Sequence, residues 1–242
     1  MRYGIFSDVH SNLEALEAVL RALADDQVDR LLCAGDLVGY GADPLPCLER
    51  IRRAGVVSVC GNHEWAAIGK MPLDWFNEHA RAAAEWTGRQ LPESEQAYLA
   101  DFPLVWKGEE LTLVHGSLDE PEQFHYVFDP ADAQACLQVQ QTPVTFIGHT
   151  HVPGVYIIEE DSRVRFLRTS QWQLESGRKA LVNVGSVGQP RDGDPRAAYC
   201  LYDTQTQVVE IRRVAYPIEQ AQAKIRAAGL PEFLANRLAY GY

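Results

Sequence analysis

Short apolar runs, rich in β-branched and aromatic side chains, recur along the first 150 residues, and each run gives way to polar residues. Apolar runs of this length without helical spacing are typical of buried strands. The pattern predicts five such strands, at residues 3–6, 31–34, 56–60, 111–114 and 144–147.

Helical spacing separates the first three predicted strands. Ser11-Asn12-Leu13-Glu14 has the spacing of a capping box, and apolar residues follow it at helical intervals as far as Leu23. A second helix is predicted at residues 44–53, after which Gly55 returns the chain to the third strand. A turn at residues 61–63 closes that strand. Residues 1–60 therefore predict a βαβαβ unit with right-handed crossovers.

The pattern changes twice further along the chain. Residues 73–99 have helical spacing, interrupted at Pro92, and predict a helical segment that covers the sheet or the site. Beyond Gly148, short alternating runs predict strands at 155–158, 164–167, 180–184, 199–202 and 208–214, and a helical tail follows at 218–240 with a break near Gly229. The expected packing stripe of the 73–99 segment is Trp75, Phe76, Ala80, Ala83, Ala84 and Trp86.

Composition limits the classes of protein that fit this pattern. The 242 residues, 46% hydrophobic and 23% charged, predict one domain over residues 1–242. A formal net charge of -11 argues against a protein that coats duplex nucleic acid, because neutralising phosphates requires clustered Lys and Arg. An anionic substrate would therefore need metal cations to hold it.

The cysteines and the chain start predict a cytoplasmic, soluble protein without a membrane partner. No basic and apolar leader precedes the first strand, and no run reaches the roughly 18 apolar residues of a membrane span. The cysteines are odd in number and form no CxxC pair, so they predict buried thiols in a reducing compartment. They are Cys33, Cys47, Cys60, Cys136 and Cys200.

Residues that bind metals follow each of the first five predicted strands. In layered α/β folds the loops at the carboxyl ends of strands converge on one crevice, so these residues are expected to meet. Carboxylates, imidazoles and one amide, without thiolates, suit Mn, Fe, Zn or Co. The five blocks are Asp8-Val9-His10, Gly35-Asp36, Gly61-Asn62-His63-Glu64, His115-Gly116 and Gly148-His149-Thr150-His151.

Spacing within the blocks predicts two metal ions. Asp8 and His10 lie two residues apart on an extended segment and can share an ion, and Asp36 is placed to bridge two ions. A turn between His149 and His151 could place the first imidazole at one ion and the second at the other. Two cations about 3.5 to 4 Å apart activate a bridging water for in-line hydrolysis of a phosphate ester.

Taken singly, each block has an ordinary interpretation. Asp8 could cap a turn, Asp36 could form an Asx turn, and His115 could be a hydrogen-bonded structural histidine. Together these readings fail, because five of the seven histidines fall inside the blocks. The other two, His79 and His125, favour packing or surface roles, although His125 could also overlook the cleft.

The five blocks, in this order, resemble the calcineurin-like metallophosphoesterases. The resemblance implies that Asp8, His10, Asp36 and His151 hold one metal, and that Asp36, Asn62, His115 and His149 hold the other. It also implies that His63 does not ligate but protonates the leaving oxygen or steadies the transition state. Residues 35–41 and 183–191 are similar to a compact bacterial subgroup related to small phosphodiesterases and diadenosine-tetraphosphate hydrolases.

One departure from related phosphoprotein phosphatases is informative. They carry Asp-Arg where this chain has Gly39-Tyr40, so the carboxylate that orients the catalytic histidine and the arginine that grips phosphate are both missing. Arg191 is the candidate replacement for the phosphate contact, because guanidinium binds phosphate oxygens bidentately. Tyr40 either stacks on the substrate or packs within the protein. Asp192 either pairs with Arg191 or lies in a solvated turn.

These inferences converge on a phosphoesterase in an α/β (α+β) fold, a four-layer α-β-β-α sandwich with two facing mixed sheets. We expect it to hydrolyse phosphomonoesters or phosphodiesters, with nucleotides and dinucleoside polyphosphates among the possible substrates, by in-line attack of a metal-bridging hydroxide. Asp36 and His63 are the expected catalytic residues, and Mn or Fe are the favoured metals. The alternatives are a Ser/Thr protein phosphatase-like enzyme and a non-catalytic scaffold; the oligomeric state stays open.

Overall fold

The computed structural model describes all residues, 1–242, and contains two mixed six-stranded sheets. In the first sheet β1, β2 and β3 are parallel to one another, and in the second sheet β5, β6 and β10 are parallel. The first sheet runs β3 (Val57–Ser58), β2 (Arg30–Cys33), β1 (Arg2–Phe6), β11 (Ala197–Asp203), β12 (Val208–Val214) and β9 (Gln171–Gln173). The second runs β4 (Val105–Lys107), β5 (Leu111–Val114), β6 (Val144–Ile147), β10 (Ala180–Asn183), β7 (Gly154–Ile158) and β8 (Val164–Leu167).

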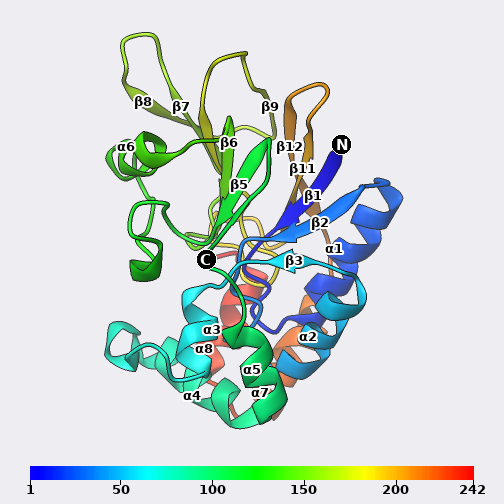
Figure 1. Cartoon of the computed structure of the whole chain (residues 1–242). Helices are drawn as coiled ribbons and strands as arrows, with labels where there is room; N and C mark the ends of the chain where they lie inside the picture. The colour runs from blue at the N-terminus through cyan, green and yellow to red at the C-terminus, as the bar shows by residue number, and fades with distance from the viewer.

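Helices cover the outer faces of both sheets. Figure 1 shows α6 on one side of the strands and α1 and α2 on the other, with a further group of helices below. The α-helices are α1 (Leu13–Asp25), α2 (Pro44–Arg53), α3 (Asn62–Ala67), α4 (Glu78–Gln90), α5 (Glu93–Ala100), α6 (Pro130–Val139), α7 (Ile218–Ala227) and α8 (Glu232–Asn236). Three 3-10 turns complete the fold: η1 (Leu73–Trp75), η2 (Pro121–Gln123) and η3 (Arg237–Ala239).

Three separate hydrophobic cores fill the spaces between four layers. Successive strand residues point to opposite faces, so Phe6 enters the core beneath α1 whereas Ile5 enters the core between the sheets. In the same way Phe146 packs between the sheets, while Ile147 packs with Leu137 of α6. Because both faces of each sheet are covered, its strands are apolar throughout, which explains the unbroken runs in the sequence. The predicted four-layer α-β-β-α sandwich is confirmed.

Several predicted elements are confirmed, and one predicted packing residue is misplaced. The βαβαβ unit forms, the second helix occupies residues 44–53 as expected, and the tail breaks into α7 and α8 around Gly229. The 73–99 segment is helical and is interrupted at Pro92, the N-cap of α5, as expected, but a further break before Asn77, the N-cap of α4, separates η1 from α4. Trp75 was expected in a packing stripe, but 64% of it is exposed.

Two strands and two α-helices were not predicted from the sequence. The edge strands β4 and β9 have three residues each, too few for an alternating pattern. The turn expected at 61–63 is the start of α3, and α6 was missed although Asp129 and Asp132 form a capping box around its Pro130. All five cysteines are buried free thiols, as predicted. None of the helices has the length and apolar character needed to span a membrane.

Candidate metal centre

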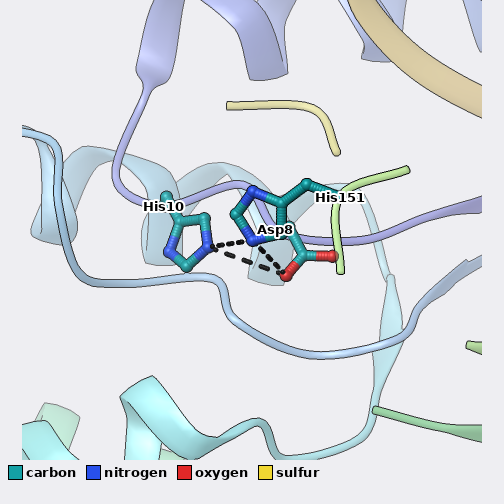
Figure 2. Close-up of side chains that lie close together, drawn as sticks. All are labelled: Asp8, His10 and His151. Atoms are coloured by element: carbon teal, nitrogen blue, oxygen red, sulfur yellow. Dashed lines mark hydrogen bonds and ion pairs between the residues drawn. The ribbon is translucent and has the colours of Figure 1, made fainter. Parts of the chain in front are cut away.

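Asp8, His10 and His151 form the first of two clusters. Figure 2 shows the three side chains pointing toward one another, although His151 is 141 residues away from His10. The Nε2 atoms of His10 and His151 are 3.1 Å apart. Asp8 Oδ1 lies 3.1 Å from His151 Nε2 and 3.6 Å from His10 Nε2. Three possible ligand atoms thus converge on one point.

Backbone contacts decide which nitrogen of each imidazole faces the cluster. Nδ1 of His10 lies 3.0 Å from the Val38 carbonyl, and Nδ1 of His151 lies 2.6 Å from the Gln189 carbonyl. A carbonyl can only accept, so each Nδ1 carries hydrogen and the neutral ring turns its Nε2 lone pair inward. Asp8 Oδ1 has no hydrogen-bond partner. A metal ion or a proton must lie between these atoms, because otherwise acceptors would face acceptors.

Asp36, His115 and His149 form the second cluster. His115 Nε2 lies 3.1 Å from Asp36 Oδ2 and 3.0 Å from His149 Nδ1, while its Nδ1 donates to the Ala34 carbonyl at 2.7 Å. Asp36 Oδ2 also lies 3.7 Å from Nε2 of His10 in the first cluster. The carboxylate of Asp36 therefore stands between the two clusters, where the sequence placed a bridging ligand.

Asn62 lies beside the second cluster. It is the first residue of α3, it lines the same cavity as Asp36 and His149, and its Oδ1 is buried without a hydrogen-bond partner. The next residue, His63, donates its backbone N–H to Asp36 Oδ1 at 2.9 Å, which fixes the start of α3 against the Asp36 carboxylate. An unpartnered amide oxygen in this position fits a metal ligand.

The electrostatics of both clusters favour a bound cation. Burial tends to raise the pKa of Asp8 and Asp36, but the surrounding histidines hold the pKa of both carboxyls well below its usual range. Burial lowers the pKa of His151 to about 3, so this imidazole stays neutral. Burial also opposes the charged form of His115, but the Asp36 carboxylate raises its pKa to about 9. A proton on His115 thus occupies the place that a metal would take, and the two should compete.

The backbone is strained where the candidate ligands lie. Positive φ angles are rare outside glycine and cost about 1 to 3 kcal/mol each, so they persist only where the surroundings enforce them. Here they occur at Asp8 (56°), His10 (49°), Asp36 (55°), His149 (66°) and His151 (61°). Concentration of strain in these loops is typical of a functional site.

Gly61 lets the loops approach closely enough to form the clusters. A Cβ at Gly61 would lie 2.1 Å from Asp36 Oδ1, which is far inside van der Waals contact. The glycine of this block is therefore required by packing against the central carboxylate.

The carboxylate of Glu64 holds two loops of the site together, a role that was not predicted from the sequence. Its fully buried carboxylate accepts the backbone N–H groups of Gly61 (2.7 Å), Asp36 (2.9 Å) and Val38 (3.2 Å). Burial and the nearby charge of Asp36 raise the pKa of Glu64 to about 7. Glu64 thereby ties the loop after β2 to the start of α3. The sequence signal that could have identified Glu64 is its position in the Gly61–Glu64 block, directly after His63.

Asn183 and Ser186 hold the two remaining loops, and both were missed as individual residues. Asn183 Nδ2 donates to the Gly148 carbonyl at 2.6 Å and to Thr150 Oγ1 at 2.9 Å, so it fixes the turn that separates His149 from His151. Ser186 Oγ donates to the Asp8 carbonyl at 2.9 Å. Asn183 is the last residue of β10 and Ser186 follows it, so the carboxyl end of this strand reaches the same rim.

Gln189 connects the first cluster to Arg191. Its backbone carbonyl accepts from His151, and its side-chain Oε1 accepts from Arg191 Nη2 at 2.8 Å and from Nε at 3.3 Å. The suggested pair of Asp192 with Arg191 is wrong, because Asp192 forms a partly buried ion pair with Arg213 instead. Arg191 lines the cavity beside His151, where it can reach an anion.

The His63 ring lies near possible ligand atoms of His10 and Asp36, but it makes no hydrogen bond to a carboxylate. Its Nδ1 is buried without a hydrogen bond, and it lies so close to Gly39 that a Cβ there would come within 2.2 Å. Tyr40 packs its ring 4.4 Å from the ring of His63 and 4.5 Å from that of His10. Burial lowers the pKa of His63 to about 3. As expected from Gly39-Tyr40, no histidine–aspartate dyad forms, and these residues instead pack closely around a neutral imidazole.

A cavity of about 250 Å³ opens over the two clusters. His125 lines it, whereas His79 lies on α4 and stacks on Phe233 at 4.8 Å, as a packing histidine should. The cavity has a metal-facing side and an aromatic side. Its lining is Asp36, Tyr40, Asn62, His63, Met71, Trp75, Phe76, Asn77, Ala80, Gln123, Phe124, His125, Tyr126, His149, His151 and Arg191.

Comparison with known proteins agrees with this geometry. Residues 1–207 match the calcineurin-like phosphoesterase superfamily domain, and the chain belongs to that family. It is 38% identical to an uncharacterised protein of Methanocaldococcus jannaschii, over 98% of this chain and 97% of the relative. It is therefore a metal-dependent phosphoesterase by family, built on a fold of two sheets with buried His and Asp groups that can bind metal.

Two solved structures extend the comparison. A metallophosphoesterase from Sphaerobacter thermophilus is 42% identical and superposes with a TM-score of 0.87, with 100% of this chain and 99% of that one covered. A protein with the provisional name diadenosine tetraphosphatase superposes with a TM-score of 0.55 over 88% of this chain and 94% of that one. At 16% identity the second similarity shows a shared fold alone.

Proposed function

We propose that this protein hydrolyses small phosphomonoesters or phosphodiesters with the help of two divalent metal ions. The observation that carries the proposal is the pair of adjoining clusters, Asp8/His10/His151 and Asp36/His115/His149, with Asp36 between them and a cavity above. Asp8, His10, Asp36 and His151 would hold one ion, and Asp36, Asn62, His115 and His149 the other. Bound ions would supply Lewis-acid charge and an activated water.

Two residues act on the phosphoryl group directly under this proposal. Arg191 binds phosphate oxygens, because its guanidinium is oriented by Gln189 and lines the cavity. His63 also lines the cavity and steadies the transition state with a hydrogen bond. A neutral imidazole favours that role over proton transfer to the leaving oxygen, since burial lowers the pKa of His63 to about 3.

The cavity favours small substrates. Its volume of about 250 Å³ is near the lower end of ligand pockets, which are about 300 to 1,000 Å³. Nucleotides and dinucleoside polyphosphates are candidates, and the latter agree with the name of the neighbour of similar fold. A Ser/Thr protein phosphatase is less favoured, because His63 lacks the carboxylate that would orient it. Mn or Fe are the proposed ions on the basis of the oxygen and imidazole ligands.

Hydrolysis of p-nitrophenyl phosphate and of bis-p-nitrophenyl phosphate by metal-defined protein tests the proposal. We expect turnover with Mn²⁺ and none with EDTA, and the ratio of the two rates gives the mono- or diesterase preference. Protein that binds two equivalents of metal and hydrolyses neither ester, nor any nucleotide, would favour the non-catalytic scaffold.

A further inference from the structure

One part of the cavity lining, next to the metal clusters, consists of aromatic rings. Trp75 and Phe76 come from the segment that begins with η1, and Phe124 and Tyr126 come from the segment that follows η2. We call these four residues the aromatic wall. Two stretches about 50 residues apart in sequence thus bring π-faces to the same opening.

Two of the four rings of the aromatic wall, Trp75 and Tyr126, are exposed, whereas Phe124 is buried. Trp75 is 64% exposed and Tyr126 is 44% exposed, and Phe128, which is 66% exposed, stacks on Tyr126 at 4.9 Å. Leaving such rings in water forgoes about 25 cal/mol for each Å² that could be buried. Large exposed apolar groups beside a cavity mark a binding surface, and the rings here are continuous with the metal-facing side.

Tyr126 is held in place by its surroundings. Its ring lies flat on the His149 imidazole, with centroids 3.7 Å apart and an interplanar angle of 16°. The adjacent Val127 carbonyl accepts a hydrogen bond from Tyr156 at 3.1 Å. Phe124 adopts a left-handed φ of 51°, a strained conformation for a bulky residue. The loop that carries Tyr126 is therefore held in a fixed conformation, and it presents this side chain to the cavity in one orientation.

Trp75 lies at the opening of the cavity, and 64% of it is exposed. It ends the short turn η1, directly before Phe76, whose ring packs edge-on against His63 at 5.1 Å. Phe76 thus anchors the segment to the catalytic side, while the indole remains uncovered. A planar group that entered the cavity could stack on it without any rearrangement of the core.

Two side-chain amides next to the aromatic wall have hydrogen-bonding capacity to spare. Asn77 uses Oδ1 to accept the N–H groups of His79 and Ala80, so its NH₂ group remains free. Gln123 lines the same cavity, and it is exposed. Aromatic faces together with amide groups suit a planar ring whose edge carries donors and acceptors, as a nucleobase does.

We propose that the aromatic wall is a subsite for a nucleobase, so that the substrate is a phosphate ester of a nucleoside. The phosphate lies at the metal clusters and Arg191, and the base stacks on Trp75 with its edge toward Asn77 and Gln123. This inference rests on the proposed function and names its substrate class. It also explains how a chain with a net charge of -11 selects an anionic substrate, since stacking adds affinity that does not depend on protein charge.

The test compares adenosine 5′-monophosphate with ribose 5-phosphate, which has the same phosphoester but no base. On Mn²⁺-loaded protein, Trp75→Leu should lower kcat/KM for the nucleotide about tenfold through KM, and should lower kcat/KM for ribose 5-phosphate much less. Trp75→Phe keeps a stacking face and should restore most of the preference. Tyr240→Leu is the matched control, because Tyr240 is 63% exposed but does not line the cavity.

Calorimetric binding of both compounds separates this inference from the proposed function. Tighter binding of the nucleotide, lost in Trp75→Leu, supports the subsite even in protein that hydrolyses nothing. Equal binding of the two compounds, or a preference that survives in Trp75→Leu, overturns the subsite even where hydrolysis is intact. The subsite would also be overturned if p-nitrophenyl phosphate bound more tightly than ribose 5-phosphate by the same factor as the nucleotide does. A plain aryl ring would then account for the difference in affinity.

Discussion

The two sides of the cavity are built in opposite ways. The metal-facing side consists of buried carboxylates and imidazoles whose remaining polar atoms are tied to backbone carbonyls and N–H groups. The aromatic wall consists of rings from two loops, and two of the rings, Trp75 and Tyr126, are exposed. The metal-facing side is therefore fixed in the absence of a ligand, whereas the aromatic wall has exposed surface that a ligand can cover.

This contrast separates the chemistry from the choice of substrate. Groups that act on the reacting bond must be held within fractions of an ångström, which explains the strained loops and the buried Glu64 beneath them. Groups that select a leaving group need only offer a matching surface, and loops can supply it. Substitutions on the metal-facing side should therefore affect turnover or metal, whereas those on the aromatic wall should affect preference.

The largest effect should come from Asp36→Asn. Because Asp36 stands between both clusters, the loss of its charge should release metal and lower kcat/KM for bis-p-nitrophenyl phosphate by about a thousandfold or more. Elemental analysis of the dialysed variant measures the metal. Asp25→Asn, an exposed position at the end of α1, serves as the control. Full activity in Asp36→Asn would remove the basis for a shared carboxylate.

His63→Ala should be the next largest change. We expect both metals to remain and kcat to fall about a hundredfold to ten-thousandfold, because the role proposed for His63 is to contact the substrate without binding a metal. His79→Ala, a histidine outside the cavity, should behave as the parent protein does. Loss of metal from His63→Ala would show that the role proposed for this imidazole is mistaken.

Gln189→Ala should have an intermediate effect confined to substrate binding. Removal of the hydrogen bonds that orient Arg191 should raise KM for a phosphomonoester about tenfold while kcat changes little. The double variant with Arg191→Ala should be no worse than Arg191→Ala alone, since Gln189 acts through that guanidinium. Fully additive losses in steady-state kinetics would instead assign Gln189 a separate contact.

The smallest expected effect is on stability. In Glu64→Gln an NH₂ group replaces one carboxylate oxygen and faces a backbone donor, which costs about 1 to 3 kcal/mol. For a chain of this size Tm should fall by roughly 3 to 10 °C, as measured by calorimetry. Glu93→Gln, an exposed residue in the first turn of α5, should leave Tm unchanged. An equal Tm for both variants would show that the Glu64 carboxylate does not hold the loops together.

The same contrast explains what could be predicted from the sequence. The blocks around Asp8, Asp36 and His149 follow strands whose apolar runs are unmistakable, so the fold and the candidate ligands could both be read from periodicity and chemistry. Asn183 and Gln189 could not, because an amide that bonds to a distant carbonyl or arginine leaves no local pattern. Trp75 was misread for a related reason. Helical spacing suggested that it packs, yet Asn77 starts α4 only beyond it.

The proposed function requires that two ions bind where the clusters lie. Anomalous diffraction from crystals grown with Mn²⁺ tests this in one measurement. We expect two anomalous peaks, one within reach of Asp8, His10 and His151 and the other within reach of Asn62, His115 and His149, with Asp36 between them. A single peak, or no peak among these side chains, would contradict it.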